Sequence, residues 1–517
     1  MQTLPIGVQD FVRLRQDNLL YVDKTARLLE LIQNGQRYFL SRPRRFGKSL
    51  TLSTLDAMFS GRAELFKDLA AEEWVSRQAQ NSSPVLRFDM SSLGSYSNSE
   101  ELDSSIMRRL ENVIEDNDLQ LRTEKTSNEM LYQIIRAICK KFRSVVVLVD
   151  EYDKPILDNI NDLKRANEMR EVLRSFYTTL KSCDEYLRFV MLTGISKFSK
   201  VGVFSAMNNL EDISMDRRFG DIAGYTQIEL ENYFSEWIKD AANKMNSTYE
   251  ELLEQLKNYY DGFSFDGVTR LYNPFSIMQC LAKARLSNYW YVSGSPTFMI
   301  KYMREHSIQD PDEYRHIEEA SDFADSHEIE RSTPESFLYQ SGYLTIEKWE
   351  GDVITLDYPN EEVRKSIVRM YLDEIYHVKR YITLGTQLWR ALEGGDVNAT
   401  VELFNTAIAA VPYDDFPNRN EFWYRSLFLM LLRGAGIISY AEVHTFKGRA
   451  DVVINFNNLI IVLEFKFASK TSEVEKMKTE GLNQIKDRKY AKSYDTEERK
   501  VVTAVLVADD QEREIIL

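Results

Sequence analysis

The sequence predicts an α/β protein in three parts: a parallel sheet flanked by helices, a mostly helical middle region, and a smaller C-terminal α/β domain. In the first part short apolar runs alternate with helical patterns, and the run at 145–149 is apolar at every position. Such a run is typical of a strand buried on both faces of a parallel sheet. Near the C-terminal end, two β-rich runs flank a two-residue turn, which predicts a hairpin.

The elements of the first part follow from these patterns in chain order. We expect strands at 37–41, 85–90, 145–149 and 188–193, and helices at about 48–60, 100–116, 127–142 and 163–182. Strands that alternate with helices favour an α/β domain. From about 226 to 400 the pattern becomes mostly helical, with aromatic-rich pieces at 259–267 and 288–294.

A loop at 411–420, VPYDDFPNRN, carries two prolines and several turn formers, and we expect a domain boundary there. After it we expect a helix at about 421–433, strands at 437–443, 449–456 and 459–467, a charged helix at about 473–491 and a last strand at 501–507. The expected domains are therefore residues 1–225, 226–410 and 411–517.

Composition narrows the class of protein. The 517 residues include 65 Lys and Arg and 80 Asp and Glu, which gives a net charge of −15. This charge disfavours bulk coating of nucleic acid but allows a local basic site. Three separated cysteines, no signal-peptide pattern and no apolar run of ~20 residues predict a cytoplasmic protein without a membrane segment. Five histidines disfavour a histidine-rich metal site.

The segment SRPRRFGKSL (41–50) follows the first strand and opens a helix, as a P-loop (Walker A) requires. Gly47 allows close approach to phosphates, Lys48 would reach the β- and γ-oxygens, and Ser49 would bind Mg²⁺. The expected nucleotide-binding residues are Arg45, Phe46, Gly47, Lys48, Ser49 and Leu50. The sequence departs from the pattern GxxxxGK[ST] at Arg42, where the pattern has glycine. The alternative to a phosphate-binding loop is a basic turn before a helix.

The strand VVVLVDEYD (145–153) ends in acids, as expected of a strand that neighbours the P-loop strand. Asp150 suits a Mg²⁺ ligand, and Glu151 suits the base that orients the attacking water. At the next strand end, the hydroxyls of Thr193 and Ser196 could sense the γ-phosphate, although for Thr193 a plain strand-end hydroxyl is an equal alternative. For Arg217 and Arg218, surface charge is favoured over a phosphate contact.

Several motifs resemble the AAA-ATPase-like family of bacterial proteins, and the resemblance covers nearly the whole chain. The motifs include FLSRPRRFGKSLTLSTL (39–55), DEYDKPI (150–156), TGISKFSKVGVFSAMNNL (193–210), YDGFSF (260–265) and LYQSGYLTI (338–346). The resemblance implies a P-loop ATPase with Arg42 as the family norm. It also implies a C-terminal PD-(D/E)xK nuclease-like domain.

The residues of the C-terminal part support a second site independently. A two-residue turn at Asn457–Asn458 places Asp451 opposite Glu464, with Lys466 on the same face. Opposed like charges destabilise a hairpin, so a divalent cation, Mg²⁺ or Mn²⁺, is expected between the acids. The D…ExK pattern assigns catalysis to all three residues and metal binding to the two acids. A solvated acid pair at a sheet edge is the alternative.

Three further residues could complete this site: Glu421 from the preceding helix, Glu442 from the preceding strand and Gln484 from the following helix. Residues 465–492 carry eight basic and four acidic side chains. They predict contact with a nucleic-acid backbone or, equally, a salt-bridged surface helix.

The sequence thus predicts an ATP-binding and ATP-hydrolysing enzyme coupled to a Mg²⁺-dependent nuclease that acts on DNA or RNA, in host defence or mobile-element control. The first alternative is an ATPase signalling or scaffold switch whose C-terminal domain binds nucleic acid or protein without cleavage. A second is a transport or chaperone-like ATPase. Oligomeric state and trigger are left open.

Overall fold

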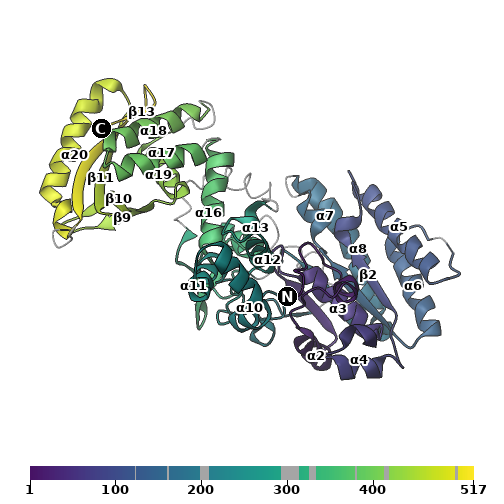
Figure 1. The fold of residues 1–517 in the computed structure, drawn as a ribbon. Helices are drawn as coiled ribbons and strands as arrows, with labels where there is room; N and C mark the ends of the chain where they lie inside the picture. Colours follow the sequence, from purple (N-terminus) through teal and green to yellow (C-terminus); the bar gives the residue numbers. More distant parts are fainter. Residues whose placement is uncertain are drawn as a thin grey trace. The chain divides into compact units, whose positions relative to one another are not determined.

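The computed structural model describes residues 1–122, 124–159, 162–197, 209–292, 314–324, 333–378, 381–412, 419–494 and 499–517 (Figure 1). The chain packs into two compact units. The first comprises the described residues within 1–292 and 314–363, and the second comprises those within 364–517.

A five-stranded parallel sheet forms the centre of the first unit, in the order β2-β3-β4-β1-β5. Its strands are β1 (Arg37–Ser41), β2 (Val85–Asp89), β3 (Val145–Asp150), β4 (Leu187–Gly194) and β5 (Glu211–Asp212). The four strands predicted from apolar runs are confirmed, whereas the two acids of β5 give no strand signal. The expectation that β3 neighbours β1 is wrong, because β4 lies between them and pairs with both.

Helices cover this sheet because each presents an apolar stripe. Along α6, for example, Met130, Ile134 and Ile138 recur at helical spacing and are buried. The helices predicted here are confirmed as α3 (Lys48–Phe59), α5 (Ser99–Asp116), α6 (Ser127–Lys141) and α8 (Leu163–Ser182). Shorter ones are α1 (Phe11–Gln16), α2 (Thr25–Asn34), α4 (Glu72–Gln78) and α7 (Lys154–Leu157). In Figure 1, α5, α6 and α8 lie side by side.

The middle region contains helices and also a sheet that the sequence reading missed. The helices are α10 (Gln227–Lys244), α11 (Tyr249–Tyr260), α12 (Pro274–Lys283), α13 (Tyr289–Val292) and α15 (Pro334–Ser341). The antiparallel sheet has the order β6-β8-β7, with β6 (Ile317–Ala320), β7 (Thr345–Glu350) and β8 (Val353–Asp357). Gly351 adopts φ +59° between β7 and β8, so a tight turn joins the two short strands.

The aromatic-rich segment at 259–267 packs against the P-loop. The ring of Phe46 lies edge-to-face with Phe263 at 4.9 Å and with Phe265 at 5.5 Å between ring centroids. All three rings are buried. The segment therefore supports the loop from behind, a contact that sequence patterns alone did not reveal.

The second unit is built on a five-stranded sheet in the order β13-β12-β11-β10-β9. Its strands are β9 (Ile438–His444), β10 (Arg449–Phe456), β11 (Leu459–Ala468), β12 (Lys500–Asp509) and β13 (Glu514–Ile516). The helices α19 (Glu421–Gly434) and α20 (Val474–Arg488) lie on opposite sides of it (Figure 1). Phe428 of α19 packs on Phe465, and a Cβ on Gly481 of α20 would clash with Val505.

Two helices assigned by sequence to the middle region pack with the second unit instead. These are α17 (Tyr381–Glu393) and α18 (Val397–Ala410), and α16 (Glu361–Met370) and the short π-helix Tyr371–Ile375 precede them. Asn405 of α18 exchanges two hydrogen bonds with the backbone of Ile515 in β13, at 2.7 and 2.9 Å. Packing thus divides the chain near residue 363, whereas the prolines predicted a domain boundary in the loop at 411–420. Residues 413–418 of that loop lie outside the described ranges.

Among the residues that the structure describes, none of the helices combines the length and the apolar character needed to cross a bilayer.

A buried carboxyl makes the stability of the first unit depend on pH. Glu362 has no exposed surface and accepts a hydrogen bond from the amide of Trp290 at 2.8 Å, and burial raises its pKa from 4.5 to about 7. The unfolded chain releases this proton at lower pH than the folded chain, so the free energy of unfolding falls as pH rises from about 4.5 to about 7. We predict that Glu362→Gln flattens this fall and raises stability at pH 8 by up to ~3 kcal/mol.

Urea denaturation of both proteins across this pH range measures the effect. A Glu362→Gln protein that loses stability with pH as steeply as the wild type would assign the fall to other groups.

Candidate active sites

The loop between β1 and α3 has the geometry of a phosphate-binding loop. Gly47 precedes α3 with φ +95°, a left-handed conformation that disfavours any side chain, although a Cβ there would meet no atom within 4 Å. The Nζ atom of Lys48 donates hydrogen bonds to the carbonyl oxygens of Arg42 (2.9 Å) and Pro43 (3.1 Å). Burial lowers the pKa of Lys48. The ammonium group is therefore bound to carbonyl oxygens of the loop, and the first amides of α3 have no intrahelical acceptor.

Arg42 explains why the loop tolerates a side chain where the pattern has glycine. Its guanidinium is buried, donates to the carbonyl oxygen of Ser214 at 2.6 Å and lies 4.3 Å from the ring centroid of Phe265. Burial lowers its pKa to about 10. Arg42 thus anchors the loop to the protein interior and does not line the cavity described below.

The acids of β3 meet β4 at the carboxyl edge of the sheet. Thr193 donates a hydrogen bond from Oγ1 to Oδ1 of Asp150 at 2.6 Å, and the amide of Glu151 donates to the same oxygen at 3.1 Å. Glu151 adopts φ +49°, and burial raises its pKa, while Lys48 opposes the rise. Thr193 therefore holds Asp150 in place, and its predicted γ-phosphate role stays a prediction.

A third acid at this edge was missed by sequence reasoning. Asp153 is buried and accepts hydrogen bonds from the amide and the hydroxyl of Ser196, both at 2.7 Å. Ser196, proposed from sequence as a further γ-phosphate sensor, is thus engaged by Asp153. The repeated acid in DEYD was the available signal. Arg218 pairs with Asp216 and Glu211 at the surface, which agrees with surface charge.

A cavity of about 540 Å³ lies next to the loop. Ligand cavities commonly have ~300–1,000 Å³. Polar and charged lining residues include Lys24, Arg44, Arg45, Lys48, Ser49 and Glu151, and apolar ones include Leu20, Val22, Phe275 and Met278. The guanidinium of Arg45 lies 4.6 Å from the ring centroid of Phe275. Cations for phosphates and an apolar wall for a base make the residues fit a nucleotide.

In the second unit the predicted hairpin register is confirmed. Phe456 pairs with Leu459 and Val452 with Leu463, so continuing the ladder places Asp451 opposite Glu464. On the other side of β10 the pairing of Val452 with Ala441 places Glu442 opposite Asp451. Three carboxylates from β9, β10 and β11 therefore form one row across the sheet.

Burial disfavours the charged form of the carboxylates in this row. Glu464 is 1% exposed, its Oε1 accepts a hydrogen bond from Nζ of Lys466 at 2.6 Å, and its Oε2 is buried without a hydrogen-bond partner among the described residues. Asp451 accepts from the amide of Phe465 at 2.7 Å. Burial raises the pKa of both acids. An orphaned carboxylate oxygen opposite a second carboxylate is a donor set that fits Mg²⁺ or Mn²⁺.

Residues 5–204 match the family model described as predicted AAA-ATPase, and residues 419–516 match the PD-(D/E)XK nuclease superfamily. An uncharacterized protein in the vnfD 5′ region of Azotobacter chroococcum mcd 1 is 34% identical over 513 residues, 95% of this chain and 93% of that protein. The chain belongs to the AAA-ATPase-like family. In this chain the ATPase-like part is followed by the PD-(D/E)XK nuclease-superfamily domain.

Two solved structures align at low similarity. The Aeropyrum pernix ORC1 protein in complex with DNA is 11% identical, with 84% of this chain and 89% of that chain covered and a TM-score of 0.24. The Aeropyrum pernix ORC2 protein, as ADPNP-ADP complexes, is 12% identical, with 81% and 85% covered and a TM-score of 0.27. These scores carry no argument about the sites of this AAA-ATPase-like protein.

Arg425 is a site residue that sequence reasoning missed. It lies one helical turn after Glu421 in α19, hydrogen-bonds Glu442 and places Nη1 3.5 Å from Oδ1 of Asp451. Its side chain is 12% exposed, and Arg449, which also pairs with Glu442, is 58% exposed. Arg425 therefore neutralises one end of the carboxylate row and Lys466 the other. Helical spacing of four from Glu421 was the available signal.

The structure also brings Glu421 and Gln484 to this region. Burial raises the pKa of Glu421, with Asp451 adding to the rise and Lys466 opposing it. Gln484 donates a hydrogen bond to the hydroxyl of Tyr490 at 3.1 Å. Glu421 is thus near enough to interact electrostatically with Asp451 and Lys466, while Gln484 contacts Tyr490.

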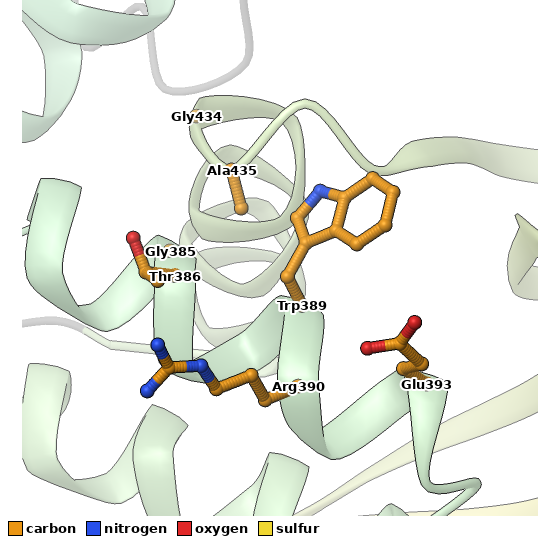
Figure 2. A pocket seen from close by; sticks show the side chains of 7 residues that line it. All are labelled: Gly385, Thr386, Trp389, Arg390, Glu393, Gly434 and Ala435. Carbon is orange, nitrogen blue, oxygen red and sulfur yellow. The ribbon is translucent and has the colours of Figure 1, made fainter.

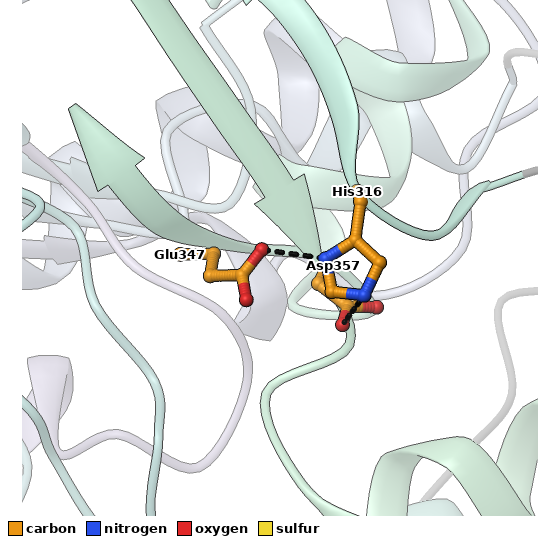
Figure 3. Close-up of side chains that lie close together, drawn as sticks. All are labelled: His316, Glu347 and Asp357. Atoms are coloured by element: carbon orange, nitrogen blue, oxygen red, sulfur yellow. Dashed lines mark hydrogen bonds and ion pairs between the residues drawn. The ribbon is translucent and has the colours of Figure 1, made fainter. Parts of the chain in front are cut away.

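Another polar cluster lies in the first unit, on the sheet β6-β8-β7. Among the described residues, one group of three side chains of metal-binding type has ligand atoms that all lie within 4.8 Å of one another (Figure 3). The group consists of His316, Glu347 and Asp357. Nδ1 of His316 lies 2.8 Å from Glu347, and Arg315 donates two hydrogen bonds to Asp357 at 3.2 Å. His316 and Glu347 are exposed. We interpret the cluster as a surface ion-pair network.

A cavity of about 440 Å³ in the second unit is distinct from the carboxylate row (Figure 2). Its lining residues are Gly385, Thr386, Trp389, Arg390, Glu393, Gly434 and Ala435. A Cβ on Gly385 would approach Ala435 to 3.1 Å, so a glycine permits the close contact of the two helices. With a single carboxylate, this cavity offers no catalytic set.

The position of Arg425 predicts its effect on metal affinity. A cation held against Asp451 competes with a divalent ion for the same negative charge. We predict that Arg425→Met tightens Mn²⁺ binding roughly tenfold, equivalent to ~1.4 kcal/mol. Titration calorimetry and Mn²⁺ electron paramagnetic resonance measure this affinity without requiring activity.

Arg449→Met is the matched control, since Arg449 pairs with Glu442 but is largely exposed. Its effect should stay within about twofold, as for exposed ion pairs. Weaker Mn²⁺ binding by the Arg425→Met protein would show instead that Arg425 organises the acids for the metal.

Proposed function

We propose that this AAA-ATPase-like protein binds and hydrolyses ATP in its first unit and cuts nucleic acid with a metal-dependent PD-(D/E)XK site in its second unit. The nucleotide state would control cleavage. The observation that carries the nuclease part is that Asp451 lies opposite the buried Glu464, whose Oε2 has no hydrogen-bond partner among the described residues and whose Oε1 accepts from Lys466. A role in host defence or mobile-element control stays a prediction from sequence.

The ATP site assigns a task to each residue. Lys48 would exchange its two loop carbonyls for phosphate oxygens, and Arg45 and the amides of 47–50 would bind the remaining phosphate charge. Phe46 would hold the loop against its aromatic support. Ser49 and Asp150 would hold Mg²⁺, which would neutralise charge that develops on the phosphates. Glu151 would orient and deprotonate the attacking water, a task that its raised pKa favours at neutral pH.

At the nuclease site Asp451 and Glu464 would hold Mg²⁺ or Mn²⁺, which would activate water and stabilise charge at the scissile phosphate. Lys466 would contact the attacked phosphate after release from Glu464. Glu421 adds a carboxylate near Asp451 and Lys466. Binding of a cation would satisfy the buried oxygen of Glu464, which has no hydrogen-bond partner in the part of the chain that the structure describes.

The alternative is an ATPase switch whose second unit binds nucleic acid or protein without cleavage. The observation that favours it is the pairing of the acids with Arg425 and Lys466, because these cations partly neutralise the row without a metal.

The ATPase proposal makes separable predictions for binding and for hydrolysis. Lys48→Ala should weaken binding of a fluorescent ATP analogue at least about tenfold, because a charge-assisted phosphate contact is lost. Glu151→Gln should keep nucleotide affinity and lower steady-state hydrolysis about 10²–10⁴-fold, because general-base catalysis is lost. Lys67→Ala, at an exposed lysine outside the cavity, is the control. Unchanged affinity in Lys48→Ala would remove the P-loop assignment.

The nuclease proposal predicts metal-dependent nicking of plasmid DNA or labelled RNA that chelation by EDTA abolishes. Glu464→Ala and Lys466→Ala should each lower the nicking rate at least about 100-fold. Glu475→Ala and Lys476→Ala, on the exposed part of α20, are the charge-matched controls. Nicking that survives in Glu464→Ala would show a contaminant or another site, and an inactive wild type that still hydrolyses ATP would favour the switch.

A further inference from the structure

The turn between β9 and β10 presents an aromatic ring to solvent next to the nuclease site. Phe446 is 53% exposed, although its backbone is fixed: its amide donates to Oγ of Ser493 at 2.8 Å. The turn is closed by the amide of Thr445, which donates to the carbonyl oxygen of Gly448 at 2.7 Å. The ring is therefore held outward by the fold and does not take part in the core.

One cation lies over this ring, and another binds the backbone of the turn. Nζ of Lys492 lies 4.3 Å from its centroid, and Nη1 of Arg488 donates to the carbonyl oxygen of Lys447 at 3.1 Å. A Cβ on Gly448 would come within 2.9 Å of Arg488, so a glycine admits the arginine against the turn. In segments 444–449 and 486–494 the charged side chains are six basic, Lys447, Arg449, Lys486, Arg488, Lys489 and Lys492, and one acidic, Asp487. This basic surface belongs to a chain whose net charge is −15.

The surface also connects directly to the carboxylate row. Phe446 precedes Asp451 by five residues, so the two lie at most about 17 Å apart along the strand. Tyr490, which follows α20, donates from its hydroxyl to the carbonyl oxygen of Arg449 at 2.9 Å. A nucleic-acid strand with bases ~3.4 Å apart would cover this distance with about five nucleotides.

We propose that the turn 445–448, with Lys492 and Arg488, is a binding surface for a single-stranded segment of nucleic acid: a base stacks on Phe446 and the cations hold neighbouring phosphates. This inference rests on the proposed function, since it assigns the substrate class of the same site. Single strands are favoured over duplex because stacking on a protein ring requires a base that is free of its duplex neighbours. The cleavable substrate is then a strand with unpaired nucleotides beside the cut.

The test measures binding without cleavage. The full chain is titrated in EDTA against short fluorescein-labelled oligonucleotides, single-stranded and duplex, and fluorescence anisotropy gives the affinities. Phe446→Ala should weaken single-strand binding about 5- to 100-fold and leave duplex binding within about twofold. Phe446→Trp should restore it. Lys492→Ala should lower the salt dependence of single-strand binding by about 0.7 in log–log slope for one lost phosphate contact.

Tyr440→Ala is the matched control, because this tyrosine is 50% exposed on β9 and lies outside the turn. Circular dichroism checks that each variant is folded. The proposal is overturned if the wild type binds no single strand, if Phe446→Ala keeps its affinity, or if it weakens duplex equally. A protein that binds through Phe446 but does not cut would contradict the nuclease function and leave this surface upheld.

Discussion

A carboxylate taken out of water must be matched by a cation or by hydrogen-bond donors, and the architecture of both sites follows from this requirement. In the first unit Asp150 accepts a hydrogen bond from the hydroxyl of Thr193, and Asp153 accepts one from the hydroxyl of Ser196. In the second unit Glu464 receives Lys466, and Asp451 lies beside Arg425. The second oxygen of Glu464 has no hydrogen-bond partner among the described residues, and together with Asp451 it forms a donor set that fits a divalent cation.

The same requirement links chemistry to packing around the P-loop. Arg42 can be buried because its guanidinium donates to backbone carbonyl oxygens and lies over the ring of Phe265. Phe46 packs edge-to-face against the same ring. The loop is thus held from behind while Lys48 and Ser49 face the cavity. A loop anchored in this way presents its amides in a fixed geometry, which lowers the conformational cost of binding phosphate. The aromatic-rich segment at 259–267 therefore serves the nucleotide site although it is far from it in sequence.

Local patterns predicted the elements whose signals are local. Fully apolar runs located β3, and the Asn457–Asn458 turn set the register that places Asp451 opposite Glu464. The sheet β6-β8-β7 was missed because its strands are short and mixed in polarity, and β13 because it has three residues. The sequence placed the residues of α17 and α18 in the middle region, whereas these helices pack within the second unit, because prolines mark loops but do not indicate on which side a helix packs.

The sequence by itself determined the residue types at each site and their spacing along single elements: the glycine and lysine of the P-loop, the acids that end β3, and the D…ExK hairpin. Only the tertiary structure decided which charges meet. In the folded protein β4 lies between β1 and β3, the side chain of Arg42 points into the interior, and Arg425 of α19 lies next to Asp451 of β10. The physical reason is that spacing fixes neighbours within a helix or hairpin, whereas contacts between elements depend on how their apolar faces are buried together.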